Sequence, residues 1–344
     1  MKIKLLGIDL AKKIFQVCAL NQANKVIFNR KVRRDKLPTL IANTPPTLVA
    51  MESCSSAHYW GRLFSQQGHQ VILIPAQHVK PFVHGGKSDS HDALAICEAA
   101  QRPAIHSVPI KTIEQQDMQL LHRLRQRHIQ HSTRLANQIR SLCREYGLIF
   151  PLSINKLIAL IPAALEDADN ELSTVARRAL FDHYQELLHT RKSAVELLKQ
   201  IQQLAAQHPA FGALKAVPGI GDLIASTYIA SVGNGHQFKR GRDVSAWLGL
   251  VPRQSGTGGK IQLGAITKNG DRYLRSLLIH GARAAINRSS KNCLPLKTWA
   301  EPIIAHRGYN KAVVALANKL SRIAWVIVAK GEPFDLKRAF KPAT

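Results

Sequence analysis

The first 110 residues alternate strand-like and helix-like segments, and this order limits the possible fold more than any other feature. Three apolar segments come first, and the polar turn Asn21-Gln22-Ala23-Asn24 between the second and third predicts an antiparallel meander. Strands and helices then alternate, as they do in sheets that carry helices on their faces. We expect strands at 3–9, 14–20, 25–31, 47–52 and 70–75, and helices at 37–42, 57–67 and 90–100.

The rest of the chain divides into two regions of different composition. Residues 112–208 contain almost no glycine, and apolar residues recur at helical spacing, which predicts a helical arm of two antiparallel helices around a loop near 150–170. Glycine returns after Pro209, and helices are expected at 222–231, 244–249, 272–287 and 311–329. The predicted domains are therefore 1–111, a coiled-coil-like arm at 112–208, and a mainly helical domain at 209–344.

Four acidic residues occupy special places in the first domain. Asp9 ends the first strand, Glu52 ends the fourth, and Asp89 and Asp92 share one face at the start of a helix. In the RNase H-like layout, which this order of elements predicts, the first and fourth strands are neighbours, so the four carboxylates are expected to converge. Carboxylate oxygens are the ligands that Mg²⁺ prefers, and bound metal can assist phosphoryl transfer. Taken singly, each acid could instead be an ordinary turn or helix-start residue.

Charge points to a polyanionic partner. The chain carries 48 Lys+Arg and 22 Asp+Glu, a net charge of +26, and residues 209–344 alone account for +15. A surface that only keeps a protein soluble mixes both signs, whereas an excess of this size favours nucleic acid.

The third region contains two motifs that suit phosphate binding. Gly219 and Gly221 precede a helix, as in a helix-hairpin-helix whose backbone N–H groups hold a DNA phosphate, although a tight turn is an alternative. Ser255 and Thr257 are predicted to lie in a flexible glycine-rich loop. A hydroxyl there could attack phosphate or only hydrogen-bond to it. The surrounding cations are Arg253, Lys260, Lys268, Arg272 and Arg275.

An ordered set of motifs resembles the DEDD-type insertion-sequence transposases, the bridge-RNA-guided recombinases. The set covers nearly the whole chain. It comprises Gly7-Ile8-Asp9 with Lys12, Met51-Glu52, Lys87-Ser88-Asp89 with Asp92-Ala93, Val217-Pro218-Gly219-Ile220-Gly221, Gly249-Leu250-Val251-Pro252-Arg253 and Thr267-Lys268-Asn269-Gly270 with Leu274-Arg275.

The resemblance implies a RuvC-like domain, a coiled-coil arm and a C-terminal transposase domain. It implies that Asp9, Glu52, Asp89 and Asp92 bind Mg²⁺ and that a serine of the last domain becomes covalently linked to DNA. It also implies a tetramer with an active site shared between protomers, and a structured guide RNA that pairs with donor and target double-stranded DNA. Ser255 fits as the nucleophile, with Thr257 as a second choice, whereas a gapless match to the family's Ser-Thr-Gly-Gly form places Gly256 at the serine position.

Several alternatives accompany this interpretation. An actin-like or sugar-kinase fold would need a phosphate turn after Gly7-Ile8-Asp9, and the sequence has none. A Holliday-junction-resolvase-like endonuclease would use the four acids with activated water, and a non-catalytic nucleic-acid-binding protein would not need them. No secretory leader or membrane-length apolar run is recognised, so a cytoplasmic protein with no membrane partner is expected. The resemblance implies a homo-oligomer, dimer to tetramer.

Overall fold

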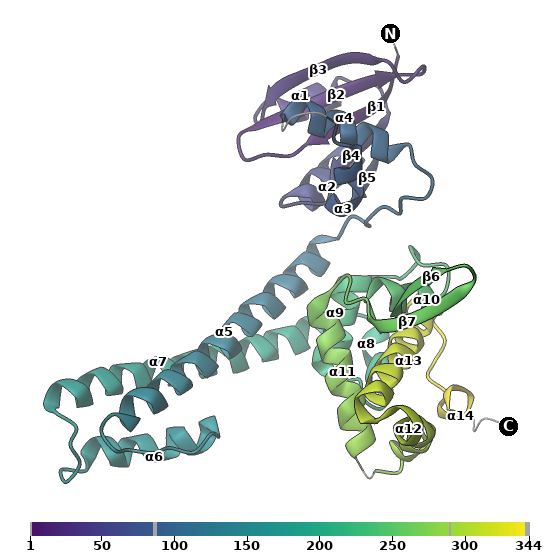
Figure 1. The fold of residues 1–344 in the computed structure, drawn as a ribbon. Helices are drawn as coiled ribbons and strands as arrows, with labels where there is room; N and C mark the ends of the chain where they lie inside the picture. The colour runs from purple at the N-terminus through teal and green to yellow at the C-terminus, as the bar shows by residue number, and fades with distance from the viewer. Residues whose placement is uncertain (1, 85–87, 289, 341–344) are drawn as a thin grey trace. The chain divides into compact units, whose positions relative to one another are not determined.

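The computed structural model describes residues 2–84, 88–288 and 290–340 (Figure 1). Lys87 of the predicted motif set lies outside these residues. The chain divides into two compact units, residues 1–112 and 113–344, which are described separately.

The first unit contains a five-stranded mixed sheet. Its strand order is β3-β2-β1-β4-β5; β1, β2 and β3 pair antiparallel, and β4 and β5 continue parallel to β1. The predicted meander is therefore confirmed, as is the adjacency of the first and fourth strands. The strands are β1 (Ile3–Asp9), β2 (Ile14–Asn21), β3 (Val26–Arg33), β4 (Leu48–Glu52) and β5 (Gln70–Ile74).

Helices cover both faces of this sheet. One core joins Leu6 and Ile8 of β1 to α1 (Leu37–Ala42) and α2 (Ala57–Gln66). A second core joins Leu5 to α4 (Asp89–Ala100) and the short helix α3 (Ala76–Val79), which a 3₁₀ turn at Lys80–Phe82 follows. Because successive side chains of a strand point to opposite faces, the apolar residues of β1 supply both cores.

The arm in the second unit differs from the prediction. It contains three helices, α5 (Ile113–Arg144), α6 (Ile154–Glu166) and α7 (Thr174–Ala206), and α6 occupies the region predicted as a loop. The apolar residues Leu157 and Ile161 of α6 are buried in the arm's own core beside residues of α5 and α7, so this segment packs as a helix instead of forming the predicted loop. At the other end of the arm, residues of α5 and α7 join the large core of the following helices.

Seven helices and one hairpin make up the remainder of the described second unit. The four predicted helices are present, whereas α12, which contains Pro295 and Pro302, was not predicted. Tyr228 lies at the centre, fully buried, and its hydroxyl donates to the Ser321 carbonyl at 2.9 Å. The elements are α8 (Ala210–Lys215), α9 (Asp222–Val232), α10 (Gly241–Trp247), β6 (Pro252–Thr257), β7 (Lys260–Ile266), α11 (Arg272–Asn287), α12 (Leu294–Arg307), α13 (Tyr309–Lys330) and α14 (Leu336–Ala339).

Helix α13 corrects one expectation from the sequence. It has 22 residues and a mean hydropathy of 1.6 in its most apolar window, so it is long and apolar enough to cross a membrane. Half of that window is buried, and Leu316, Leu320 and Ala324 belong to the core of the second unit. The helix is therefore best explained as a core helix, and nothing else in the described chain indicates a membrane protein.

Candidate active site

Strand alternation directs two of the predicted acids to the same face of the sheet. Leu5 and Gly7 of β1 lie on the α4 face, so Asp9, two residues further on, faces α4 as well. Ala50 of β4 packs on that face, which places Glu52 there too. Because β1 and β4 are parallel neighbours in register, their terminal carboxylates lie at the same edge of the sheet.

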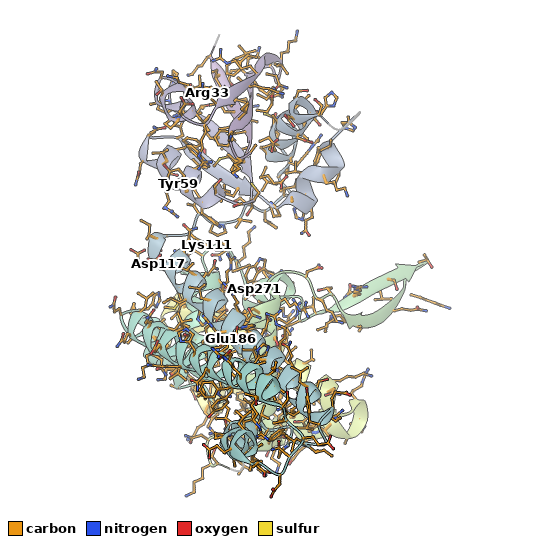
Figure 2. All side chains as sticks on the ribbon, turned by 90° about the vertical axis from the view of Figure 1, so that its left-hand side faces the viewer. Arg33, Tyr59, Lys111, Asp117, Glu186 and Asp271 are labelled. Carbon is orange, nitrogen blue, oxygen red and sulfur yellow. The ribbon has the colours of Figure 1, made fainter. Side chains whose placement is uncertain are left out.

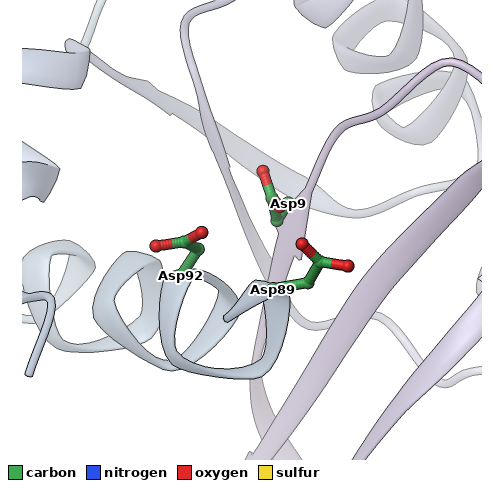
Figure 3. Close-up of side chains that lie close together, drawn as sticks. All are labelled: Asp9, Asp89 and Asp92. Atoms are coloured by element: carbon green, nitrogen blue, oxygen red, sulfur yellow. The ribbon is translucent and has the colours of Figure 1, made fainter. Parts of the chain in front are cut away.

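The remaining two acids reach this edge because α4 packs unusually close to β1. A Cβ atom on Gly7 would lie 2.6 Å from the Ala93 carbonyl oxygen and would also collide with the Cys97 sulfur, so only glycine allows this approach. Asp92, which precedes Ala93, is thereby brought to Asp9. Oxygen atoms of Asp9, Asp89 and Asp92 lie within 4.8 Å of one another (Figure 3).

The electrostatics show that Glu52 belongs to the same group of charges. Burial raises the pKa of Asp9 to about 6, and the charges of the other three acids add to the effect. Burial, followed by the charge of Asp92, also raises the pKa of Glu52. The structure thus brings Asp9, Asp89 and Asp92 together as a cluster, with Glu52 within electrostatic reach of it.

These residues fit a hard divalent cation. The cluster offers only carboxylate oxygens, which suit Mg²⁺, Ca²⁺ or Mn²⁺ better than softer metals. One exposed cation, Lys31, approaches Asp89 at 3.8 Å, and two groups 68% and 65% exposed gain little from such a pair. A bound cation would compensate both the burial and the repulsion by neighbouring acids that raise the pKa of Asp9.

Two residues that were not predicted from the sequence hold the start of α4. Gln16, the cross-strand partner of Asp9, donates from Nε2 to Oδ1 of Asn29 at 2.6 Å. Asn29 in turn donates from Nδ2 to the Ser90 carbonyl at 2.9 Å. Gln16 is 5% exposed and was detectable as the one polar side chain within the otherwise apolar run 15–20.

The predicted serine lies on a regular hairpin, which corrects the expectation of a flexible loop. Gly258 and Gly259 both have positive φ, and such a pair favours the tight turn between β6 and β7. Ser255 pairs with Gln262 and Thr257 with Lys260, so these four side chains share one face. Every residue of β6 is exposed, and Figure 2 shows the hairpin extending away from the helices of its unit.

The hairpin register separates Ser255 from Gly256. Gly256 pairs with Ile261 and faces the opposite side from Ser255. A Cβ atom on Gly256 would lie 2.7 Å from the Lys260 carbonyl oxygen, so a serine does not fit at that position without a backbone shift. Arg253 lies on the Ser255 face, because its Cβ is 3.8 Å from the Cβ position of Gly264. This arrangement favours Ser255 over position 256 as the hydroxyl of interest.

The other predicted cations differ in accessibility. Lys268 and Arg272 are exposed near the start of α11, and Lys268 adopts a left-handed conformation with φ of 58°. Arg275 is only 7% exposed, and its Nη1 donates to the carbonyl oxygens of Leu248 and Asn269. Its geometry favours a role in holding the hairpin base together over a contact with DNA.

The two predicted glycines lie between α8 and α9. Gly219 has φ of 91°, and a Cβ atom there would lie 2.9 Å from the Gly281 carbonyl oxygen of α11, so this glycine serves a turn and a close helix contact. Gly221 precedes α9 with open space around it. The first residue of α9, Asp222, is engaged by Lys215 at 2.6 Å.

Comparisons with known proteins cover most of the chain. Residues 6–148 match the model of the DEDD transposase domain of IS110 elements, described as a transposase, and residues 212–294 match the transposase family IS116/IS110/IS902. The chain is 42% identical to a probable family 20 transposase of Pseudomonas aeruginosa over 96% of its own length and 98% of the relative's. It is 39% identical to the transposase for insertion sequence element IS1111A of Coxiella burnetii, over 96% and 91%. It is 36% identical to the transposase for element IS1328 of Yersinia enterocolitica, over 97% and 99%.

The mixed α/β first unit, the largely helical second unit and these matches define a transposase, an enzyme that cleaves and rejoins DNA. The chain belongs to the IS110 family of insertion-sequence transposases. Its substrate is therefore DNA, and the DEDD type of its first domain suggests dependence on a divalent metal.

Proposed function

We propose that this transposase cuts and rejoins DNA through a covalent link between DNA and Ser255. The observation that supports this most directly is the exposed Ser255 hydroxyl on a regular hairpin, beside Arg253, Thr257 and Lys260. We further propose that Asp9, Glu52, Asp89 and Asp92 form the metal-binding half of the site. The two halves belong to different units of the chain.

In the proposed step the Ser255 oxygen attacks the scissile phosphorus. A bond from phosphorus to the serine oxygen forms, a bond from phosphorus to a sugar oxygen breaks, and the serine proton passes overall to the released sugar oxygen. One phosphodiester replaces another, so the step conserves bond energy and can be reversed with a different DNA end. Cations such as Arg253 and Lys260 would stabilise the charge that develops on the phosphoryl oxygens.

The four acids would hold Mg²⁺, which when bound supplies charge stabilisation to the transferring phosphoryl group. The chain's own contribution is geometric. Gly7 lets α4 approach the sheet, and Asn29 fixes the carbonyl of Ser90 at the helix start, so the carboxylates of Asp89 and Asp92 stay near Asp9.

We also propose the partners that the resemblance implies: double-stranded DNA at the element ends and target, a structured guide RNA that specifies sequence by pairing, and a homo-oligomer between dimer and tetramer. The +15 charge of residues 209–344 supports binding to nucleic acid of either kind. Arg253, Lys260, Lys268 and Arg272 are exposed and suited to backbone phosphates, and Gly219 and Gly221 would present a helix-hairpin-helix-like turn. A cytoplasmic location is part of the same proposal.

The domain boundaries remain proposals. We infer a RuvC-like domain at 1–111, a coiled-coil arm at 112–208 and a C-terminal transposase domain at 209–344. The separate hydrophobic core of the arm supports treating it as a distinct element of the second unit.

A denaturing gel tests the serine link. The protein is incubated with Mg²⁺, element-end DNA and RNA transcribed from the element, and we expect a labelled DNA band shifted by the mass of the protein. Ser255→Ala should abolish this band, whereas Thr257→Ala, a matched hydroxyl loss on the same hairpin face, should leave it. A band that survives Ser255→Ala and disappears in Thr257→Ala would transfer the role to Thr257.

A second candidate mechanism uses metal-activated water, as in a Holliday-junction-resolvase-like endonuclease, and the acid cluster favours it when taken alone. It predicts nicked DNA without a covalent band, with activity lost in Asp9→Ala and kept in Ser255→Ala. A non-catalytic nucleic-acid-binding protein is excluded, because the chain belongs to a family of DNA-cleaving and rejoining enzymes.

A further inference from the structure

A cavity of about 530 Å³ lies in the second unit, and the residues that line it come from elements other than the hairpin strands β6 and β7. Its walls come from the start of α10, the C-terminal half of α13 and the segment 332–339 that includes α14 (Figure 1). Ligand sites in proteins commonly enclose 300–1,000 Å³, so the cavity is large enough for a nucleotide-sized molecule.

The lining of this cavity carries more cations than acids. Five basic residues face two acidic ones, and both acids are already engaged. Glu332 pairs with Arg338 at 2.9 Å, and Oδ1 of Asp335 accepts two backbone N–H bonds at the start of α14. Among the described residues, no acid pairs with Arg242 or Arg322.

Two cations of α13 are held close together without a countercharge. The Lys319 Nζ lies 4.8 Å from the Trp299 ring centre and 4.9 Å from that of Phe340, which fixes the ammonium group between two aromatic faces. Burial, followed by the charge of Arg322, lowers the pKa of Lys319. An anion bound between Lys319 and Arg322 would relieve this repulsion, so the pair is suited to a phosphate.

The lining of the same cavity also contains an apolar wall. Ile323, Val326 and Phe334 line it together with Trp325. The Trp325 ring is held by a hydrogen bond from its Nε1 to the Gly235 carbonyl at 3.0 Å. A polar, flexible ligand would leave this wall unused, whereas a flat ring attached to a phosphate would contact both the wall and the cations.

We propose that this cavity binds one unpaired nucleotide of a single-stranded nucleic acid, with its phosphate among the lining cations Lys319, Arg322 and Arg242 and its base against the apolar side chain of Phe334. The proposal rests on the family assignment for the presence of nucleic acid, but not on the covalent role of Ser255. Paired bases are stacked and cannot enter such a cavity, whereas strand cleavage and exchange expose unpaired ones.

The test is binding of fluorescent twelve-residue oligonucleotides to the full chain in EDTA, measured by anisotropy. The probes are oligo-dT, oligo-rU and an abasic DNA strand with the same number of phosphates. The charge variant is Arg242→Ala/Arg322→Ala, and its control is Arg178→Ala/Lys199→Ala, which removes two exposed charges from the arm. The wall variant is Phe334→Ala, controlled by Phe181→Ala, an exposed aromatic on the arm.

We expect the charge variant to weaken binding of oligo-dT or oligo-rU about tenfold and its control by at most about twofold. Phe334→Ala should weaken binding of a base-bearing strand and leave the abasic strand unchanged, and the strand that loses more identifies the ligand as DNA or RNA. Equal losses in the charge variant and its control would overturn the proposal, as would an equal effect of Phe334→Ala on the abasic strand. A competition measurement adds a third outcome. If a twelve-residue poly-glutamate displaces both labelled strands at a lower concentration than an unlabelled oligonucleotide does, the cavity takes an acidic peptide and the proposal is overturned.

These measurements need neither metal nor cleavage. A failure here therefore leaves the covalent band of the proposed function untouched, and a missing band leaves the oligonucleotide results valid.

Discussion

Asp9→Asn should stabilise the metal-free protein while abolishing DNA cleavage. The side chain of Asp9 is half-buried beside three other acids, and its pKa is raised from 3.8 to about 6 by burial and then by their charges. At neutral pH the folded protein must therefore carry a carboxylate that its surroundings disfavour. Asparagine has nearly the same shape and no charge, so it removes this penalty together with a proposed metal ligand.

The size of the effect follows from the pKa. A rise from 3.8 to about 6 corresponds to about 3 kcal/mol between the charged and neutral forms, at about 1.36 kcal/mol per pKa unit. Because the carboxylate is only half-buried, solvent screening reduces this to about 1.5 kcal/mol. For a unit of 112 residues, that free energy raises Tm by about 6 °C.

The pH dependence has a definite sign. The folded state binds the Asp9 proton more tightly than the unfolded state, so the stability of the wild-type protein falls as pH rises from about 4 through 6. The advantage of Asp9→Asn should therefore be small at pH 4 and fully present at pH 8. Mg²⁺ should raise the Tm of the wild-type protein, since a cation that binds only the folded state stabilises it, and should raise that of the variant much less.

Differential scanning fluorimetry in EDTA at both pH values measures this, with Asp35→Asn as the control. Asp35 is an exposed acid of the same unit whose only ion pair among the described residues is the surface contact with Arg33 at 3.2 Å, so its loss should move Tm little. If Asp9→Asn leaves Tm unchanged or lowers it at pH 8, the acids do not repel one another as the structure implies. If Mg²⁺ stabilises both proteins equally, Asp9 does not hold the metal.

Three further outcomes are expected in the second unit. Arg275→Ala should lower the free energy of unfolding by about 1.5–3 kcal/mol in urea titrations, because it leaves the Leu248 and Asn269 carbonyls without their charged donor, and a selective loss of DNA affinity at unchanged stability would contradict this. Gly249→Ala should destabilise by more than about 1 kcal/mol, since its φ is 67° and its Cβ would lie 2.6 Å from the Asn269 oxygen; wild-type thermal stability would refute the clash. Burial lowers the pKa of His122 from 6.5 to about 4, so its contribution to stability is lost as pH falls from 6.5 to 4. His122→Gln should flatten that part of the stability curve, and an unchanged slope would show that other groups cause it.

Strand periodicity predicted most of the first unit because local and tertiary preferences agree there. The apolar run at 3–9 forms β1 with the same bounds, and Asp9 and Glu52 end neighbouring strands as expected. The pattern did not predict why α4 lies so close to β1. That approach depends on the absence of a side chain at Gly7, which faces Ala93 of α4, and the two residues are far apart in sequence. The role of Asn29 in holding the start of α4 could not be predicted for the same reason, since its hydrogen-bond partner is a backbone carbonyl 61 residues away.

In the second unit the prediction was misled by glycines and missed one helix. Gly258 and Gly259 suggested flexibility, yet two consecutive residues with positive φ form a tight hairpin turn. Helix α12 was not predicted, and its Pro295 stands in the first turn, where a proline costs no hydrogen bond. Glycine and proline mark interruptions of a helical or strand periodicity, but their presence does not show whether a helix or strand ends there or continues through a turn or a first helical turn.

The two halves of the proposed site are held in place by different means. Asp9 stands on a sheet buried on both faces, where α4 cannot move without disturbing the close contact at Gly7. Ser255 stands on a two-stranded hairpin with no buried residue in β6, and such a hairpin is only marginally stable in water on its own. Its position must therefore be determined at its base, where Arg275 and the tight packing of Gly249 join the chain on either side of the strands. Substitutions at that base should consequently slow formation of the proposed covalent link even though they do not touch the Ser255 hydroxyl, because misplacing a reacting group by about 1 Å can cost about 100-fold in rate.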